Sequence, residues 1–292
     1  MPAHEASSNG PEPLPIESAQ GESPRSEAAP GEALVIEAIG LQKHFATTIA
    51  VDGVDLAVRA GEFFGFLGPN GSGKSTTIGM LTTQLLPDQG TMRVAGFDPV
   101  TQAIEVKRCI GILPEEIQTF DRLTVRELVT FSGRIRGLAL DVVATRREEL
   151  LELMELSSKE RNKLLIDCSM GMRKKAVLCS AIIHKPRVLF LDEPFNGIDA
   201  RTSIAIRALL DALRRGGTTV FFSSHILELV ERLCTRLAIV EHGRVRASGT
   251  IDELRDRVGL GRDASFEDVF LASLEERGTT TTELSWLSSP SS

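Results

Sequence analysis

Residues 68–76 limit the folds open to this chain more than any other segment. They read Gly-Pro-Asn-Gly-Ser-Gly-Lys-Ser-Thr and fit the pattern G-x-x-x-x-G-K-[ST]. An apolar run, residues 62–67, precedes them, and a run with helical character, residues 76–86, follows them. A glycine-rich loop between a buried strand and a helix predicts an α/β fold with a largely parallel sheet and a site for phosphate groups.

The residue types in this loop suit a nucleotide. Glycines let the backbone curl so that its N–H groups point inward, and the following helix adds partial positive charge at its N-terminus. Lys74 is expected to neutralise the β- and γ-phosphates, and Ser75 to complete the shell of a Mg²⁺ ion. A glycine-rich turn without a ligand is the alternative, but the order strand, loop, helix favours binding. The candidate ATP-binding residues here are Gly68, Pro69, Asn70, Gly71, Ser72, Gly73, Lys74, Ser75 and Thr76.

Polar residues follow two further apolar runs, residues 188–191 and 218–222. In parallel sheets ligands bind beyond the carboxyl ends of the strands, so these residues are candidates for catalysis. Asp192 is expected to hold Mg²⁺ through water, and Glu193 to orient or deprotonate the water that attacks the γ-phosphate. His225 can donate a hydrogen bond to the γ-phosphate, although its position alone does not separate this role from that of a surface or core histidine.

The chain divides into a core and two tails. Residues 1–32 hold six glutamates and one arginine among Pro, Ser, Ala and Gly, which predicts a disordered acidic tail. Residues 276–292 are predicted to be a flexible C-terminal tail. Within a single domain, residues 33–275, the stretch from about 116 to 182 shows helical spacing and little strand character, which predicts a helical insert.

Composition excludes several classes of protein. Outside the acidic tail the charges nearly balance and form no basic stripe, so no nucleic-acid partner is expected. The four cysteines form no CxxC pair, which is typical of a reducing compartment. The sequence shows no apolar run near the ~20 residues that cross a bilayer and no signal peptide. A cytoplasmic protein is predicted.

With these motifs in order, the sequence resembles the ABC ATPase family over about residues 34–274. The glycine-rich loop, the run Leu-Asp-Glu-Pro, the segment Asn-Gly-Ile-Asp at residues 196–199 and His225 follow that family's order. The family's signature motif, Leu-Ser-Gly-Gly-Gln, corresponds to Cys-Ser-Met-Gly-Met at residues 168–172. The resemblance implies a P-loop NTPase (RecA-like) core with an antiparallel β edge and an inserted α-helical subdomain, using ATP and Mg²⁺.

The resemblance also assigns roles to the signature. Ser169 is expected to cap a helix that runs through His184. Ser169, Met170 and Gly171 are expected to face the γ-phosphate of ATP held by a second cassette, so that two cassettes in head-to-tail array bury two nucleotides.

Three positions depart from the family pattern. Phe45 stands where an aromatic residue, usually Tyr, stacks on adenine, and its ring keeps that capacity. Glu115 stands where Gln commonly contacts the Mg²⁺ sphere and the membrane subunit; a carboxylate still accepts from a metal-bound water but cannot donate. Cys168 and Met170 make the signature atypical, which predicts slower or partner-dependent turnover.

The resemblance extends to cassettes that power export of drugs, oligosaccharides and nodulation factors. It implies an ATPase subunit, peripheral on the inner face of the cell membrane, that forms a homodimer and serves a separate permease of about six helices. The alternative is a soluble cassette acting in translation, repair or regulation, although such proteins generally resemble tandem cassettes or carry long coiled coils. A nucleotide sensor that does not hydrolyse ATP is opposed by Glu193 and His225. The sequence identifies neither the cargo nor the permease, and it leaves a heterodimer open.

Overall fold

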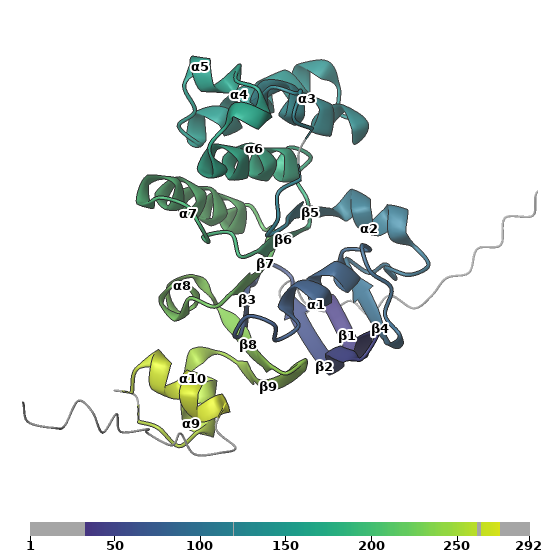
Figure 1. Ribbon diagram of the computed structural model, residues 1–292, viewed down its shortest axis with the longest axis vertical. Coiled ribbons are helices and arrows are strands. Elements are labelled where there is room, and N and C mark those ends of the chain that lie inside the picture. Colours follow the sequence, from purple (N-terminus) through teal and green to yellow (C-terminus); the bar gives the residue numbers. More distant parts are fainter. Residues whose placement is uncertain (1–32, 119, 262–263, 275–292) are drawn as a thin grey trace, which may run out of the picture.

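The structure is a computed structural model that describes residues 33–118, 120–261 and 264–274 (Figure 1). The two predicted tails, residues 1–32 and 276–292, lie outside the described residues. Among the described helices, none combines the length and the apolar character needed to cross a membrane.

A six-stranded sheet forms the centre, in the order β5-β6-β7-β3-β8-β9. Every neighbouring pair is parallel except β8 and β9, which are antiparallel. Three strands, β3, β6 and β7, are buried along their whole length, as is typical of parallel strands covered on both faces. They correspond to the three apolar runs, so those strand predictions are confirmed. The strands are β3 (Phe63–Leu67), β5 (Ile110–Leu113), β6 (Val188–Asp192), β7 (Thr219–Ser224), β8 (Arg236–Glu241) and β9 (Arg244–Gly249).

A second sheet is antiparallel, in the order β2-β1-β4. Its strands are β1 (Leu34–Phe45), β2 (Thr48–Arg59) and β4 (Gln89–Val94). Side chains on β3 point alternately to two hydrophobic cores, because successive residues of a strand face opposite sides. Phe64 and Phe66 pack with this sheet and helix α1 (Lys74–Leu81), whereas Phe63 and Leu67 pack with helices on the other side. The predicted antiparallel β edge is confirmed.

Helices cover the opposite face of the central sheet and extend beyond it. The group α3 to α6 lies at the top of Figure 1, remote from the antiparallel sheet. Helix α3 begins in a capping box, in which Thr124 and Glu127 each bond the other's backbone N–H. The inserted helical subdomain is therefore present; its limits at about residues 116 and 182 stay a prediction. The remaining helices are α2 (Ala103–Cys109), α3 (Val125–Ile135), α4 (Leu140–Leu153), α5 (Ser158–Arg161), the 3₁₀ turn η1 (Leu165–Asp167), α6 (Met170–Ile182), α7 (Ala200–Arg215), α8 (Leu227–Leu233), α9 (Ile251–Arg257) and α10 (Phe266–Leu274).

Two predicted helix ends are wrong by a few residues. The run expected over residues 76–86 forms α1, which starts at Lys74 and stops at Leu81. Thr83 adopts a left-handed backbone with φ of 67°, and Pro87 disfavours a helical Leu86 before it. Likewise α6 ends at Ile182 rather than His184, because Lys185 is left-handed and Pro186 follows.

Candidate active site

The glycine-rich loop joins β3 to α1 as the sequence predicts. Gly71 and Gly73 have φ of 79° and 99°, in the left-handed region that favours glycine. A Cβ on Gly73 would also collide with the carbonyl oxygen of Ala50. Only glycine allows this close approach, which brings strand β2 against the start of α1.

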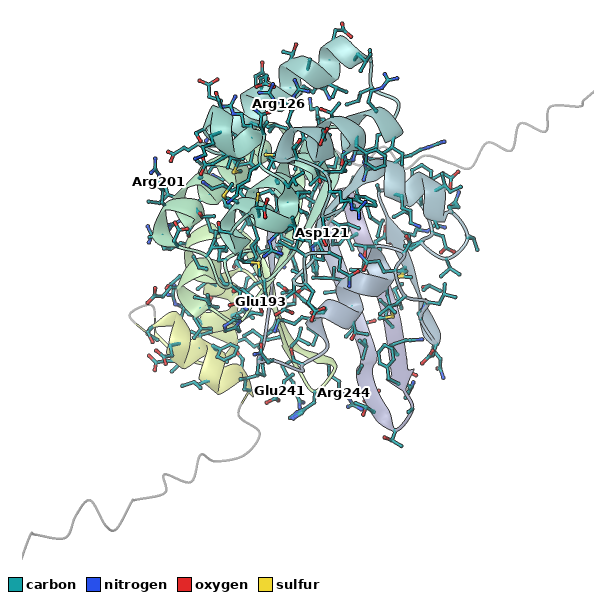
Figure 2. The ribbon with its side chains drawn as sticks, turned by 45° about the horizontal axis from the view of Figure 1, so that its top comes forward. Asp121, Arg126, Glu193, Arg201, Glu241 and Arg244 are labelled. Atoms are coloured by element: carbon teal, nitrogen blue, oxygen red, sulfur yellow. The ribbon has the colours of Figure 1, made fainter. Side chains whose placement is uncertain are left out.

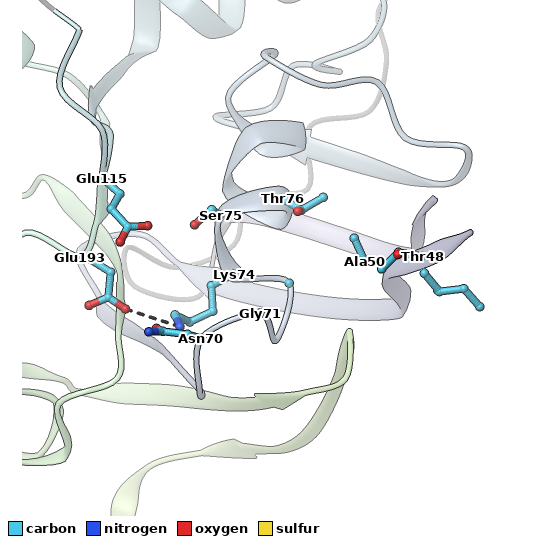
Figure 3. Close-up of a pocket in the computed structure, with 11 residues that line it drawn as sticks. Thr48, Ala50, Asn70, Gly71, Lys74, Ser75, Thr76, Glu115 and Glu193 are labelled. Carbon is cyan, nitrogen blue, oxygen red and sulfur yellow. Dashed lines mark ion pairs between the residues drawn. The ribbon is translucent and has the colours of Figure 1, made fainter. Parts of the chain in front are cut away.

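A cavity of about 410 Å³ opens at this loop (Figure 3). It is lined by Thr48, Ile49, Ala50, Asn70, Gly71, Gly73, Lys74, Ser75, Thr76, Glu115 and Glu193. Six of the nine predicted loop residues line it, and Gly68, Pro69 and Ser72 do not. The carbonyl oxygens of Gly68 and Pro69 instead accept hydrogen bonds from Lys74 Nζ, at 2.8 and 3.1 Å. The β2 residues on its wall were not predicted.

Lys74 and Glu193 meet inside this cavity. Lys74 Nζ lies 3.4 Å from Glu193 Oε1, and the exposed fractions of the two side chains are 5% and 4%. Figure 2 shows Glu193 within the body of the molecule, whereas Arg201 lies at its edge. Glu193 has φ of 46°, an uncommon conformation for a residue with a Cβ. This backbone directs its carboxylate toward the phosphate-binding loop.

Ser223 bonds both Asp192, the last residue of strand β6, and Glu193, which follows it, a role that the sequence did not reveal. Its hydroxyl donates a short hydrogen bond to Asp192 Oδ1 and accepts one of 3.0 Å from the backbone N–H of Glu193. This role of Ser223 follows from the register of the sheet, in which Asp192 pairs with Ser223 across the parallel strands β6 and β7. All three residues are buried.

His225 contacts Glu193 and does not line the cavity at the glycine-rich loop. Its Nδ1 is 3.0 Å from Glu193 Oε2, and its side chain is 40% exposed. The other ring nitrogen is thus free to reach a group outside this pair. The predicted catalytic residues Lys74, Glu193 and His225 therefore form one connected cluster.

The three predicted metal-binding residues share a second cavity, of about 520 Å³. It is lined by Ser75, Gln84, Pro114, Glu115, Glu116, Gln118 and Asp192. The set offers one hydroxyl and several carboxylate and amide oxygens, which are the hard ligands that Mg²⁺ prefers. Among the described residues, no three His, Cys, Asp or Glu side chains form a metal cluster by themselves. A Mg²⁺ ion held here would take its remaining ligands from water and phosphate.

Phe45 stands beside the first cavity but does not line it. It is the last residue of β1 and pairs in register with Thr48, which does line the cavity. Its ring is exposed, and Lys43 Nζ lies 5.7 Å from the ring centroid. Asp88 holds that lysine with a hydrogen bond of 2.8 Å, which together with the His44 N–H lowers the pKa of Asp88 to about 2. The ring is accessible for stacking on a base.

The predicted signature residues lie at the start of α6. Ser169 caps this helix, as expected, and its hydroxyl accepts from the N–H of Met172 at 3.3 Å. Ser169 lines a third cavity, of about 390 Å³, which shares no residue with the first. Met170 is exposed, whereas Gly171 is buried against Thr202 at the start of α7. This cavity is lined by Glu155, Leu156, Ser157, Glu160, Ser169, Met172, Lys175, Asp199, Arg201 and Thr202.

Comparison with known proteins identifies the family. The sequence profile described as ABC transporter matches residues 51–196. The daunorubicin/doxorubicin resistance ATP-binding protein DrrA of Streptomyces peucetius is 40% identical over 224 residues, covering 77% of this chain and 68% of that protein. The Nod factor export ATP-binding protein I of Ralstonia nicotianae is 33% identical over 234 residues, covering 79% of this chain and 73% of that protein.

Solved structures agree. The structure of an ATP-binding subunit of an ABC transporter aligns with a TM-score of 0.77 and 27% identity, covering 82% of this chain and 100% of that one. The chain belongs to the ABC transporter family, as one of its ATP-binding subunits with ATPase activity. The predicted family, fold class and enzyme class are confirmed.

Proposed function

We propose that this chain hydrolyses ATP to power export of a drug-like or lipid- or oligosaccharide-like compound through a separate membrane permease. The meeting of Lys74, Glu193 and Ser75 around one cavity carries the hydrolytic part of this proposal. The export part rests on the relatives, whose names describe drug resistance and Nod factor export. Such a subunit works at the inner face of the cell membrane.

The geometry supports a division of labour in hydrolysis. Lys74 and the N-terminal N–H groups of α1 bind the phosphates, and the low exposure of Lys74 strengthens its attraction for their charge. Glu193 accepts the proton of the attacking water or orients it, while His225 bonds the carboxylate and presents its second nitrogen to the γ-phosphate. Ser75, Asp192 and Glu115 would hold Mg²⁺, which when bound would supply positive charge to offset that of the phosphates.

A second cassette, in the simplest case another copy of this chain, completes each nucleotide site. The signature cavity at Ser169 contains a capped helix start and is separate from the cavity at Lys74. Its lining holds two cations, Lys175 and Arg201, and three carboxylates, one of which, Glu155, pairs with Arg201. The helix start is the feature that suits phosphate. In a head-to-tail pair, each signature cavity meets the ATP on the partner's glycine-rich loop.

An exposed aromatic pair supports a membrane partner. Phe120 and Phe131 are 62% and 45% exposed, and their rings meet edge to face with centroids 5.8 Å apart. Ile135, on the same helix as Phe131, is also exposed. Exposed apolar groups of this kind mark interaction surfaces. Phe120 follows Glu115, a residue of the cavity at Lys74, by five positions in the chain, so this segment offers a connection between a permease bound here and the ATP site.

Affinity purification of the tagged chain from detergent-solubilised host membranes, followed by mass spectrometry, tests the proposal. Recovery of a permease of about six helices supports export. Recovery of soluble partners alone would instead support a cassette that acts in translation, repair or regulation. A Phe120→Asp, Phe131→Asp double variant is expected to lose the permease while keeping ATP binding. Retention of the permease by this variant would contradict the assignment of the aromatic surface.

A further inference from the structure

Lys174 is a buried cation in α6 that binds the backbone just after strand β6. Its side chain is 2% exposed. Its Nζ donates hydrogen bonds to the carbonyl oxygens of Glu193 at 3.0 Å, Asn196 at 2.6 Å and, more weakly, Pro194 at 3.5 Å. All three N–H groups of this ammonium thus donate hydrogen bonds to a single turn, residues 193–196.

This turn determines where the carboxylate of Glu193 points. Glu193 is left-handed, a conformation that persists in a residue with a Cβ only where its surroundings hold it. The Glu193 N–H donates to the Ser223 hydroxyl, and the Glu193 carbonyl oxygen accepts from Lys174 Nζ at 3.0 Å and from the Asn196 N–H at 3.2 Å. The backbone of the proposed general base is therefore fixed at both of its polar groups.

Stability alone is a poor explanation for Lys174. Burying an ammonium group is costly, and replacing such a group with an apolar side chain is often neutral or stabilising. Burial lowers the pKa of Lys174, and the charges of Glu115 and Glu193 act against this shift. The hydrogen bonds of this lysine therefore go to main-chain oxygens and not to either carboxylate.

Lys174 also connects two distant parts of the proposed mechanism. It lies on the same helix as Ser169, the cap of the signature cavity, whereas Glu193 lines the cavity at Lys74. A shift of α6 would move the Glu193 backbone, because the hydrogen bonds from Lys174 join α6 to the turn at residues 193–196.

We propose that Lys174 is a positioning residue: it fixes the orientation of Glu193 and ties that orientation to the signature helix. The inference rests on the proposed role of Glu193 as the base. Lys174 acts through Glu193 and touches neither the phosphates nor the attacking water.

Three variants of the full chain test this role. Lys174→Met keeps the length of the side chain and removes its donors. It is expected to lower kcat at least ~10-fold while the KM for ATP stays within about threefold, because the phosphate-binding loop is untouched. Lys174→Gln retains an N–H donor and is expected to recover part of the lost kcat. Cys179→Ala, at another buried position of α6, controls for loss of packing and is expected to leave kcat near wild type although its Tm falls.

Two further measurements separate positioning from general damage. Hydrogen exchange in the peptide that covers residues 192–199 is expected to accelerate in Lys174→Met and not in Cys179→Ala. In a Glu193→Gln background, Lys174→Met is expected to have little further effect on the rate, since a positioning residue has nothing left to position.

The inference is overturned if folded Lys174→Met keeps kcat within twofold of wild type, or if Cys179→Ala loses as much activity as Lys174→Met. It is also overturned if the Lys174→Met, Glu193→Gln double variant shows the product of the two single losses in kcat. Failure of the base assignment looks different. In that case Glu193→Gln alone hydrolyses ATP like wild type, while exchange in the turn still responds to Lys174→Met.

Discussion

Lys74 and Glu193 lie with Nζ and Oε1 3.4 Å apart, although they follow strands that do not touch each other. Lys74 comes after β3 and Glu193 directly follows β6, and β7 runs between these strands. The three strands are parallel, so their carboxyl ends reach the same edge of the sheet. The sheet order brings together a phosphate-binding cation, a carboxylate and, from the end of β7, His225.

Replacing Lys74 with Ala is expected to lower ATP hydrolysis at least ~10²-fold, because the substitution removes the buried charge that would face the phosphates. Steady-state phosphate release and nucleotide-binding titration measure the two effects. Lys107→Ala, at an exposed position of α2, is the matched control. ATP turnover near the wild-type rate in Lys74→Ala would contradict the assignment of the glycine-rich loop as the phosphate-binding site.

Glu193→Gln is expected to bind ATP normally and hydrolyse it at least ~10²-fold more slowly, since an amide cannot accept the proton from water. Because ATP persists, the variant should accumulate as a dimer in size-exclusion chromatography with ATP and Mg²⁺. Addition of excess EDTA should abolish residual hydrolysis. Glu149→Gln, exposed on α4, should behave as wild type, and equal rates for both variants would refute the assignment of Glu193 as the base.

Ser223→Ala is expected to reduce kcat about 10-fold and to destabilise the fold by about 1–3 kcal/mol, because Asp192 and the N–H of Glu193 both lose a buried partner. Calorimetry and steady-state kinetics give the two quantities. Ser180→Ala removes a hydroxyl that bonds only within α6, to Val177, and should leave kcat unchanged. An unchanged kcat in Ser223→Ala would reduce Ser223 to a structural role.

The sequence predicted those parts of the site that depend on neighbours along the chain. A few consecutive residues define each of these parts: the glycine-rich loop, the acids after residues 188–191 and the helix cap at Ser169. Strands β3, β6 and β7 were predictable for a similar reason, since each is a short apolar run buried on both faces.

What the sequence did not reveal depends on register and tertiary packing. The role of Ser223 follows from its pairing with Asp192 across β6 and β7. The hold of Lys174 on the turn after β6 follows from how α6 packs, and lysine in an amphipathic helix ordinarily faces solvent. Thr48 reaches the cavity wall through the β1–β2 hairpin, while Phe45 remains beside it.

Ser169→Arg tests whether the signature cavity binds the nucleotide of a second cassette. A bulky side chain at this helix start would fill the cavity, so the ATP-dependent dimer should be lost while each monomer still binds nucleotide. Chromatography in the Glu193→Gln background with ATP gives the dimer fraction. Ala144→Arg, on the exposed side of α4, is the control. A dimer that forms equally well in both variants would exclude contact in trans at Ser169.

His184 is expected to make stability fall as the pH is lowered from about 6.5 to about 4. Its Nε2 lies 3.0 Å from the carbonyl oxygen of Ile110, and its Nδ1 is buried without a partner. Burial, followed by the charge of Arg136, lowers the pKa of His184 to about 4. The unfolded chain, with an ordinary histidine pKa near 6.5, therefore binds more protons across this window than the folded chain does.

Calorimetric Tm values at pH 7 and pH 5 measure this contribution. His184→Gln keeps a donor for Ile110 and does not titrate, so its Tm should drop less between the two pH values than that of wild type. The difference should amount to about 2–4 °C for each kcal/mol that the histidine contributes. His242→Asn, at an exposed left-handed position that Asn tolerates, should retain the wild-type dependence. Equal drops in wild type and His184→Gln would show that other groups govern acid unfolding.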